Sequence, residues 1–451
     1  MKDLKILHAK IPNFETNSWE IADILIDRGM ISEVGTVHED TAETIDAGEQ
    51  IVSPGFIDIH AHEDHFTGGA KDFFTAACAV RMGVTTRIGG NCGESYNRIE
   101  DFCRRIVADG SPTNYMMFVG QNSLRQYAGA DDRYRPSTAR QLDQMKRDLA
   151  ISKKYGPVGL SCGFEYAPGV TTEETIELLT ALNEEGYLTS VHFRSDGPGS
   201  LDSIDELIEI QRRSGYGIQM SHIGSCSAVG YMEQALASIS HARSQGVDIT
   251  CDCYPYTAFC TGIGTAVFDE ESFQKWDYSD LLITAGPYKG KRCDKKLFQL
   301  LRRTNPDLYV AAFVMNEPEV ELAFQAPFVM VGSDGGFSDD GGHPRGAGTF
   351  PRVLGRLVRE KGVLTLLDAL RKMTVLPADR LNLHTKGEIK EGFDADLVIF
   401  DEAAISDCAT YENPTLAPEG ISHVIVNGQI AVRGKNLVNP SLGRYIPYKN
   451  R

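Results

Sequence analysis

The chain has 451 residues, of which 42% are hydrophobic and 24% are charged, as is usual for a globular protein. Its net charge of -17 and its lack of a basic run argue against nucleic acid as a partner. No stretch approaches the roughly 18 uninterrupted apolar residues of a membrane span, and the chain start has no signal-peptide core. Ten cysteines over this length fit no disulfide-dense scaffold, so we expect reduced thiols and a cytoplasmic location, with no membrane partner.

Short β-rich runs separated by turns occupy both ends of the chain. Apolar and polar residues alternate with a period of two in several of them, and Gly, Asp and Asn separate them. The β-rich runs are 22–27, 27–35, 392–400, 421–426 and 430–432. Two such ends flanking a long middle predict one small β-sandwich domain, formed by residues 1–53 and 386–451.

Apolar strands alternate with amphipathic helical patterns in the middle of the chain. The strand-like runs are 85–88, 115–119, 158–161, 188–192, 218–222, 248–253 and 328–333. The helical patterns cover 173–185, 200–213 and 231–245. With a strand that ends at His60, these runs predict an α/β fold, a parallel (β/α)8 TIM-like barrel over residues 54–385. The segment at about 265–327 exceeds a normal βα unit and predicts an insertion over the barrel mouth.

The first barrel strand ends in two histidines one residue apart. An apolar, β-branched run leads from Ile51 through Pro54 and Gly55 to His60 and His62. Residues i and i+2 of a strand share a face, so both imidazoles would leave the strand end side by side. This arrangement favours a metal ion held from a rigid element.

Further candidate ligands occur where other apolar runs give way to loops, which is where barrels of this type build their active sites. The candidates are His60, His62, Cys92, Glu165, His192, His222 and Asp334. Each alone has a structural explanation: a hydrogen-bonded histidine, a small buried thiol, a salt-bridge carboxylate or a helix cap. Their coincidence at matched places favours a shared site.

The candidate set combines imidazole, thiolate and carboxylate groups, which suits Zn²⁺. Four imidazoles and one thiolate could hold two ions, or one tight ion and one weaker ion. Bound zinc lowers the pKa of its water towards 7 and supplies hydroxide at neutral pH. A carboxylate beside that water can take its proton and later give it to a leaving nitrogen, and Asp334 is placed for that role.

Longer motifs extend the pattern over nearly the whole chain. They are residues 53–62, 90–93, 163–169, 192–197, 221–222, 252–258, 332–335, 343–345, 348–356, 386–389 and 392–398. In combination they resemble the amidohydrolase superfamily and, within it, the N-acyl-D-amino-acid deacylase (D-aminoacylase) family. The last two motifs resemble the return of that family into its β-sandwich.

The resemblance implies two metal positions. The tight zinc would be held by Cys92, His192 and His222, and the weaker position by His60 and His62. Cys92 would be able to bridge them, and Asp334 would touch the metal site as general acid/base. The carboxylated lysine that bridges in many relatives has no candidate here, and Glu165 stands in the corresponding segment. Whether Glu165 or Cys92 bridges is left open.

Substrate contacts depart from the family pattern. Relatives that bind an α-carboxylate tend to carry a lysine where this chain has Gly224. The remaining cations that could face the pocket are Arg125 and Arg194, and Tyr256 is available as a donor. Each arginine could equally form a structural salt bridge.

The sequence therefore predicts a zinc-dependent hydrolase of a small-molecule amide, cleaving an N-acyl-D-amino acid by attack of metal-bound hydroxide. An alternative is a cyclic-amide hydrolase of the dihydroorotase or hydantoinase type, which the missing lysine keeps open. A third reading is an inactive scaffold that has lost its metals, but the chain retains every candidate ligand. No sequence pattern specifies an oligomeric state.

Overall fold

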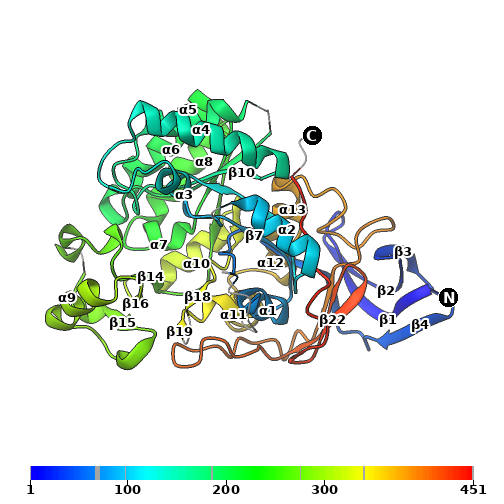
Figure 1. Ribbon diagram of the computed structural model, residues 1–451. Coiled ribbons are helices and arrows are strands. Elements are labelled where there is room, and N and C mark those ends of the chain that lie inside the picture. The colour runs from blue at the N-terminus through cyan, green and yellow to red at the C-terminus, as the bar shows by residue number, and fades with distance from the viewer. Residues whose placement is uncertain are drawn as a thin grey trace.

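The computed structural model describes residues 2–448, apart from 65, 67–71, 97, 184–185, 275 and 339–340. Figure 1 shows a large α/β body and, on the right, a sheet that contains strands from both ends of the chain. Within the described residues, no helix combines the length and apolar character that crossing a membrane requires.

Strands from both chain ends share one sheet of nine strands among the described residues. Its members are β1 (Lys2–Asn13), β2 (Ser18–Asp27), β3 (Met30–Gly35), β4 (Thr41–Asp46), β5 (Ile51–Pro54), β20 (Leu397–Phe400), β21 (Ile421–Val426), β22 (Gln429–Arg433) and β23 (Asn436–Leu437). The two ends meet where β5 and β20 pair antiparallel, from Ile51 opposite Phe400 to Pro54 opposite Leu397. Alternate residues such as Leu4, Ile6 and Ile24 fill a core of their own.

The body contains two parallel sheets that follow each other along the chain. The first sheet consists of β6 (Phe56–Asp58), β7 (Val84–Gly89) and β8 (Asn114–Met117). The second consists of β9 (Val119–Gly120), β10 (Gly159–Gly163), β11 (Leu188–His192), β12 (Gly217–Met220), β13 (Ile249–Cys253) and β17 (Val329–Val331). Phe118 alone separates β8 from β9, and a parallel bridge between Ala61 and Gly335 links the segments after β6 and β17. The strand ends are thereby gathered at one face.

Helices connect and cover these strands. They are α1 (Phe74–Arg81), α2 (Ile99–Asp109), α3 (Gln121–Tyr127), α4 (Ala139–Ser152), α5 (Thr172–Leu182), α6 (Ser200–Ser214), α7 (Ile223–Ser227), α8 (Met232–Ser244), α10 (Glu317–Gln325), α11 (Arg345–Arg352), α12 (Leu366–Met373) and α13 (Val375–Arg380), with a π-helix at Val353–Glu360. Their apolar faces pack on the strands, as Leu178, Leu179 and Leu182 of α5 do. Threonine side chains cap α4 and α5 at their first turns.

Residues 254–316 form a separate layer between β13 and α10, seen at the lower left of Figure 1. Strands β14 (Phe259–Gly262), β16 (Tyr309–Ala312) and β15 (Leu281–Ile283) make an antiparallel sheet beside α9 (Lys295–Thr304). The sequence places the end of this insertion at about residue 327, eleven residues beyond residue 316. Helix α10 packs against α8 and β17 and so belongs to the body. A short two-stranded ribbon, β18 (Phe337–Ser338) and β19 (Gly341–Gly342), follows β17.

Candidate metal centre

Three of the candidate ligands occupy strained backbone positions at strand ends. The φ angles are 55° for Cys92, 33° for His222 and 49° for Asp334, in the left-handed region that non-glycine residues rarely adopt. Cys92 follows β7, His222 follows β12 and Asp334 follows β17. Such strain persists only where surrounding contacts hold it, and it is common at functional sites.

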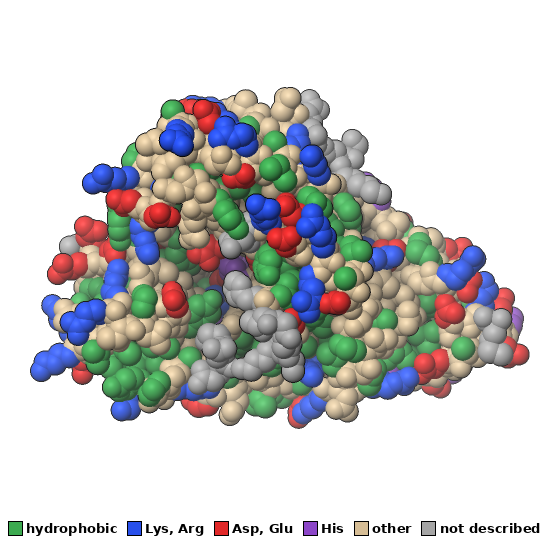
Figure 2. Space-filling model, viewed as in Figure 1, with side chains coloured by type: hydrophobic (Ala, Val, Ile, Leu, Met, Phe, Trp, Pro, Cys, Tyr) green, Lys and Arg blue, Asp and Glu red, His purple; other side chains and the backbone are tan. Residues whose placement is uncertain are grey.

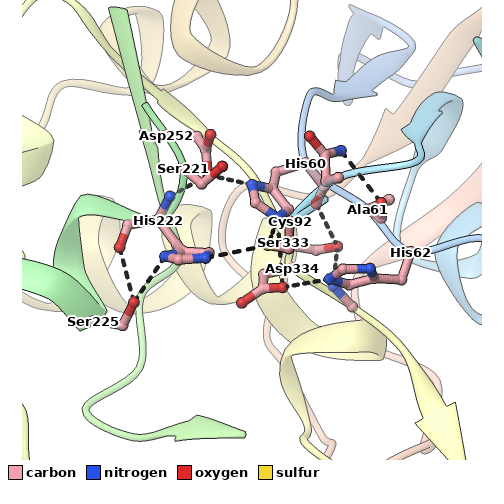
Figure 3. Close-up of polar contacts among 12 residues, drawn as sticks. His60, Ala61, His62, Cys92, Ser221, His222, Ser225, Asp252, Ser333 and Asp334 are labelled. Atoms are coloured by element: carbon pink, nitrogen blue, oxygen red, sulfur yellow. Dashed lines mark hydrogen bonds and ion pairs between the residues drawn. The ribbon is translucent and has the colours of Figure 1, made fainter. Parts of the chain in front are cut away.

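The candidate side chains converge on the Cys92 thiol (Figure 3). The Cys92 Sγ atom lies 3.4 Å from His60 Nε2 and 3.4 Å from His222 Nε2. Within the described residues, two groups have ligand atoms close enough together to hold a metal ion, one with His60, His62, Cys92 and Asp334 and one with Cys92, His192 and His222. Cys92 belongs to both groups and therefore lies between two adjacent positions.

Glu165, the other candidate bridge, is placed differently. Its Oε2 atom lies 3.0 Å from His192 Nε2, at the edge of the second group. Its carboxylate is in neither of the two described ligand groups. The arrangement therefore favours Cys92 over Glu165 as the shared ligand.

Buried polar side chains fix the orientation of the histidines. Asp252 on β13 lies with Oδ1 3.1 Å from His60 Nδ1, and the same oxygen accepts the backbone N–H of His222 at 2.9 Å. The Ser225 hydroxyl lies 2.8 Å from His222 Nδ1. Because the Nδ1 atoms are engaged, the Nε2 atoms of both rings face Cys92. This outer layer is typical of metal-binding histidines.

The chemistry of these groups fits a zinc ion. Burial alone raises the pKa of the Cys92 thiol, but the neighbouring His60, His222 and His192 outweigh burial and hold that pKa well below its usual range. The thiolate is the form that binds metal. In addition, the Nδ1 atom of His192 is buried and has no hydrogen-bond partner among the described residues. An orphaned imidazole nitrogen beside a thiolate is a ready ligand position.

Asp334 lies between the histidines and a buried arginine. Its Oδ1 atom is 2.9 Å from His62 Nε2 and 3.5 Å from His60 Nε2, whereas Oδ2 is 2.9 Å from Arg345 Nη1. Burial raises the pKa of Asp334, but Arg345 and His62 outweigh burial and hold that pKa well below its usual range. A second layer fixes this loop, because Asp58 accepts hydrogen bonds from the Ser333 backbone N–H and hydroxyl at 2.8 and 2.5 Å.

A cavity of about 510 Å³ opens onto the candidate metal centre. Its inner part is lined by His62, Cys92, Tyr166, Asp334 and Arg345. Figure 2 shows a hollow near the middle of this face, with a histidine side chain visible inside it. The cavity is large enough for a small-molecule substrate.

Arg345 is the site residue that sequence reasoning missed. It is buried, it lines the cavity, and its Nη2 atom donates to the Cys260 carbonyl at 3.1 Å. Its Nε atom has no hydrogen-bond partner among the described residues. The available signal was its position in the motif 343–345, eleven residues after Asp334 and beyond the last parallel strand.

Unlike Arg345, the two arginines that the sequence predicted to bind substrate each pair with a glutamate. Arg125 borders the cavity, but it is buried and paired with Glu174 at 3.0 Å. Arg194 forks onto both oxygens of Glu206 at 2.9 and 2.7 Å and is not among the residues that line the cavity.

Tyr256 and Gly224, the other two positions that the sequence analysis considered for substrate contacts, do not line the cavity. Tyr256 packs edge-on against His343, with its hydroxyl 3.4 Å from Asp407, and does not line the cavity. A Cβ atom at Gly224 would lie 3.0 Å from Cys253 Sγ. The local packing therefore leaves little room for a lysine at this position.

Comparisons with known proteins identify relatives that match almost the whole chain. A model of the amidohydrolase family matches residues 312–432. The chain is 34% identical to N-acyl-D-glutamate deacylase of Alcaligenes xylosoxydans xylosoxydans over 90% of this chain and 89% of the relative. The crystal structure of N-acyl-D-glutamate deacylase from Bordetella bronchiseptica, complexed with zinc and a phosphonate mimic of the tetrahedral intermediate, is 30% identical and has a TM-score of 0.87 over 99% of this chain and 100% of that chain.

A D-aminoacylase structure described for its binuclear metal centre, with one-metal activation and second-metal attenuation, has a TM-score of 0.88 at 27% identity over the full length of both chains. A dihydroorotase of Streptococcus pneumoniae is more distant, at 24% identity over 89% of this chain and 90% of the relative. The chain therefore belongs to the N-acyl-D-amino-acid deacylase family of metal-dependent amidohydrolases.

Proposed function

We propose that this protein is a zinc-dependent deacylase that hydrolyses N-acyl-D-amino acids to a carboxylic acid and a free D-amino acid. The observation that carries the proposal is the convergence of one thiol, four imidazoles and Asp334, of which Cys92, His62 and Asp334 line the cavity. Cys92, His192 and His222 would hold one zinc tightly, and His60 with His62 would hold a weaker position.

The architecture supports this assignment. We propose that the parallel strands from β6 to β17 close into a (β/α)8 barrel over about residues 54–385, with the insertion at 254–316 beside its mouth. The proposed ligands then follow different strands at the carboxyl end of one barrel, where such folds carry their active sites. Residues 1–53 and 386–451 would form the β-sandwich domain. All ten cysteines are free thiols, which supports a cytoplasmic location.

Zinc bound at this centre would lower the pKa of a water molecule and polarise the scissile carbonyl. Asp334 is the group that would move the proton. It is ionised beside Arg345, so it can accept a proton from the attacking water as the new C–O bond forms. It would then return that proton to the amide nitrogen as the C–N bond breaks. His62 holds the carboxylate in place through Oδ1.

Arg345 supplies a recognition element for a linear substrate. The guanidinium is buried next to Asp334, lines the cavity and retains an unpaired Nε donor among the described residues. A substrate carboxylate placed here would gain a charge-assisted hydrogen bond close to the scissile amide. This cation favours a substrate with a carboxylate, such as an N-acyl amino acid, over a hydantoin, which has none.

The first prediction tests this recognition. Wild-type enzyme should have a much lower KM for N-acetyl-D-methionine than for its primary amide, because the amide lacks the carboxylate. Arg345→Met should raise KM for the acid at least about thirtyfold and should remove the preference. The measurement is steady-state kinetics on both compounds.

Arg194→Met provides the matched control for that prediction. It removes a guanidinium that lies outside the cavity lining and should preserve the preference for the acid. A preference that survives in Arg345→Met and disappears in Arg194→Met would reverse the two assignments.

A further inference from the structure

Acidic side chains dominate the mouth of the active-site cavity. Glu94, Asp131 and Asp307 all line the cavity and are exposed, so they lie at its outer end. Among the described lining residues, Arg133 is the one exposed cation there, and its Nη1 atom donates to the Gly264 carbonyl at 3.2 Å. Among the described lining residues, the mouth therefore has three exposed carboxylates and one exposed guanidinium.

Asp131 and Asp307 belong to two segments that are joined across the mouth. Asp131 lies in the loop after α3, and Asp307 lies in the insertion before β16. Arg133 bonds to Gly264, and the Tyr134 hydroxyl donates to Asp269 at 2.8 Å, so the loop is fixed against the insertion. Because both segments are tied together, their carboxylates can act on the same ligand.

The cavity lining also includes a buried hydrogen-bond acceptor that has no donor among the described residues. Asn122 lines the cavity and is only 8% exposed. Its Nδ2 atom donates to the Gly163 carbonyl at 3.1 Å, but its Oδ1 atom is buried and accepts no hydrogen bond from the described residues. A buried unpaired acceptor calls for an N–H donor on the bound molecule.

The two ends of the cavity therefore differ in what they can bind. The Arg345 end offers an unpaired donor to a carboxylate, whereas Asn122 and the mouth offer acceptors and negative charge. A second carboxylate on the substrate side chain would meet like charge at the mouth. A guanidinium or ammonium would meet complementary charge, which raises the association rate and the specificity.

We propose that this deacylase selects N-acyl-D-amino acids with a cationic side chain, of the arginine or lysine type, through Asp131 and Asp307. The inference rests on the proposed function, because it concerns the side chain of the same substrate. It distinguishes this chain from its relatives named for N-acyl-D-glutamate, despite 34% identity to one of them.

The test compares three substrates on zinc-loaded enzyme: N-acetyl-D-arginine, its neutral isostere N-acetyl-D-citrulline, and N-acetyl-D-glutamate. The kcat/KM for the arginine compound should exceed that for the citrulline compound about tenfold, as expected when two exposed ion pairs form. The glutamate compound should be the poorest. Added salt should lower the ratio of kcat/KM for the arginine compound to kcat/KM for the citrulline compound.

Variants at the mouth identify the residues responsible. Asp131→Asn and Asp307→Asn should each lower the arginine-to-citrulline ratio of kcat/KM about threefold. Asp40→Asn makes the same charge change on an exposed residue between β3 and β4, outside the cavity, and should leave the ratio unaltered. Equal kcat/KM for arginine and citrulline compounds, or preference for the glutamate compound, would overturn the inference. Turnover of none of the three would instead contradict the proposed function.

Discussion

Cys92 occupies the position on which both proposed metal sites depend. Its thiol faces His60 and His222 at equal distances, and it belongs to both ligand groups. Cys92→Ala should therefore lose the tight zinc, whereas His62→Ala should lose only the weaker position. Metal analysis of the purified proteins measures both outcomes. Full zinc content in Cys92→Ala would remove the thiolate from the site and leave Glu165 as the bridging candidate.

Asp334 is proposed to transfer a proton as well as to contact the metal site. These two roles can be tested separately. Asp334→Asn keeps the size of the side chain but removes the proton acceptor. We expect kcat to fall by about 10²–10⁴ while zinc remains bound through Cys92, His192 and His222. Turnover numbers measured together with zinc content check this. Near-normal turnover would assign the proton transfer to another group, with Glu165 the nearest alternative.

Sequence periodicity predicted the individual strands and helices best. The predicted strands 188–192 and 421–426 coincide with β11 and β21, and the helix predicted at 200–213 is one residue shorter than α6. These segments have strong periodicity and clear turn residues at both ends. Because each candidate ligand was read from a strand end, locating the strands also located the candidates.

Other features could not be predicted from the sequence because they depend on contacts between distant elements. The amphipathic pattern of α10 is only nine residues long and begins with Glu317-Pro318, so the sequence did not separate it from the insertion. The pairing of Arg194 with Glu206, in contrast to that of Arg345 with Asp334, likewise cannot be read from spacing. Both arginines follow strand ends, and only the packed structure shows which one reaches the cavity.

Strand β13 couples the ends of two other strands through one carboxylate. Asp252 contacts the His60 ring and the His222 backbone, so it positions one ligand from each proposed metal group. Asp252→Asn should weaken zinc binding about 10–100-fold, as expected for loss of an orienting carboxylate. Competition with a zinc-binding dye measures this affinity.

The control for this prediction is Asp248→Asn, immediately before the same strand. Its carboxylate pairs with Arg380 at 2.6 Å and contacts none of the proposed ligands, so zinc affinity should remain unchanged. Unaltered zinc affinity in Asp252→Asn would show that the histidines keep their orientation without this carboxylate.

At the scale of the whole molecule, a buried ion network attaches the C-terminal part of the chain to the body. Lys386 lies 2.9 Å from Asp394 and also pairs with Asp396, and Asp396 accepts a hydrogen bond from Asn114 of β8 at 3.0 Å. The sequence indicated that both ends are β-rich, but only the structure shows how they are joined. Buried charges of this kind need all their partners, which ties the terminal sheet to the body.

The family assignment was confirmed by relatives that match almost the whole chain. The alternative of a cyclic-amide hydrolase is weaker, because the dihydroorotase relative is 24% identical whereas the N-acyl-D-glutamate deacylase is 34% identical. We therefore propose that the activity depends on the α/β body, the insertion and the proposed metal centre acting together on a linear amide.

One measurement tests this central claim most directly: hydrolysis of paired N-acetyl-D- and N-acetyl-L-amino acids, with dihydroorotate and a hydantoin alongside, by zinc-loaded enzyme. We predict turnover of the D compounds, little or none of the L compounds and none of the cyclic amides, with activity lost on chelation and restored by zinc. Hydrolysis of a cyclic amide without deacylation of any D compound would contradict the account.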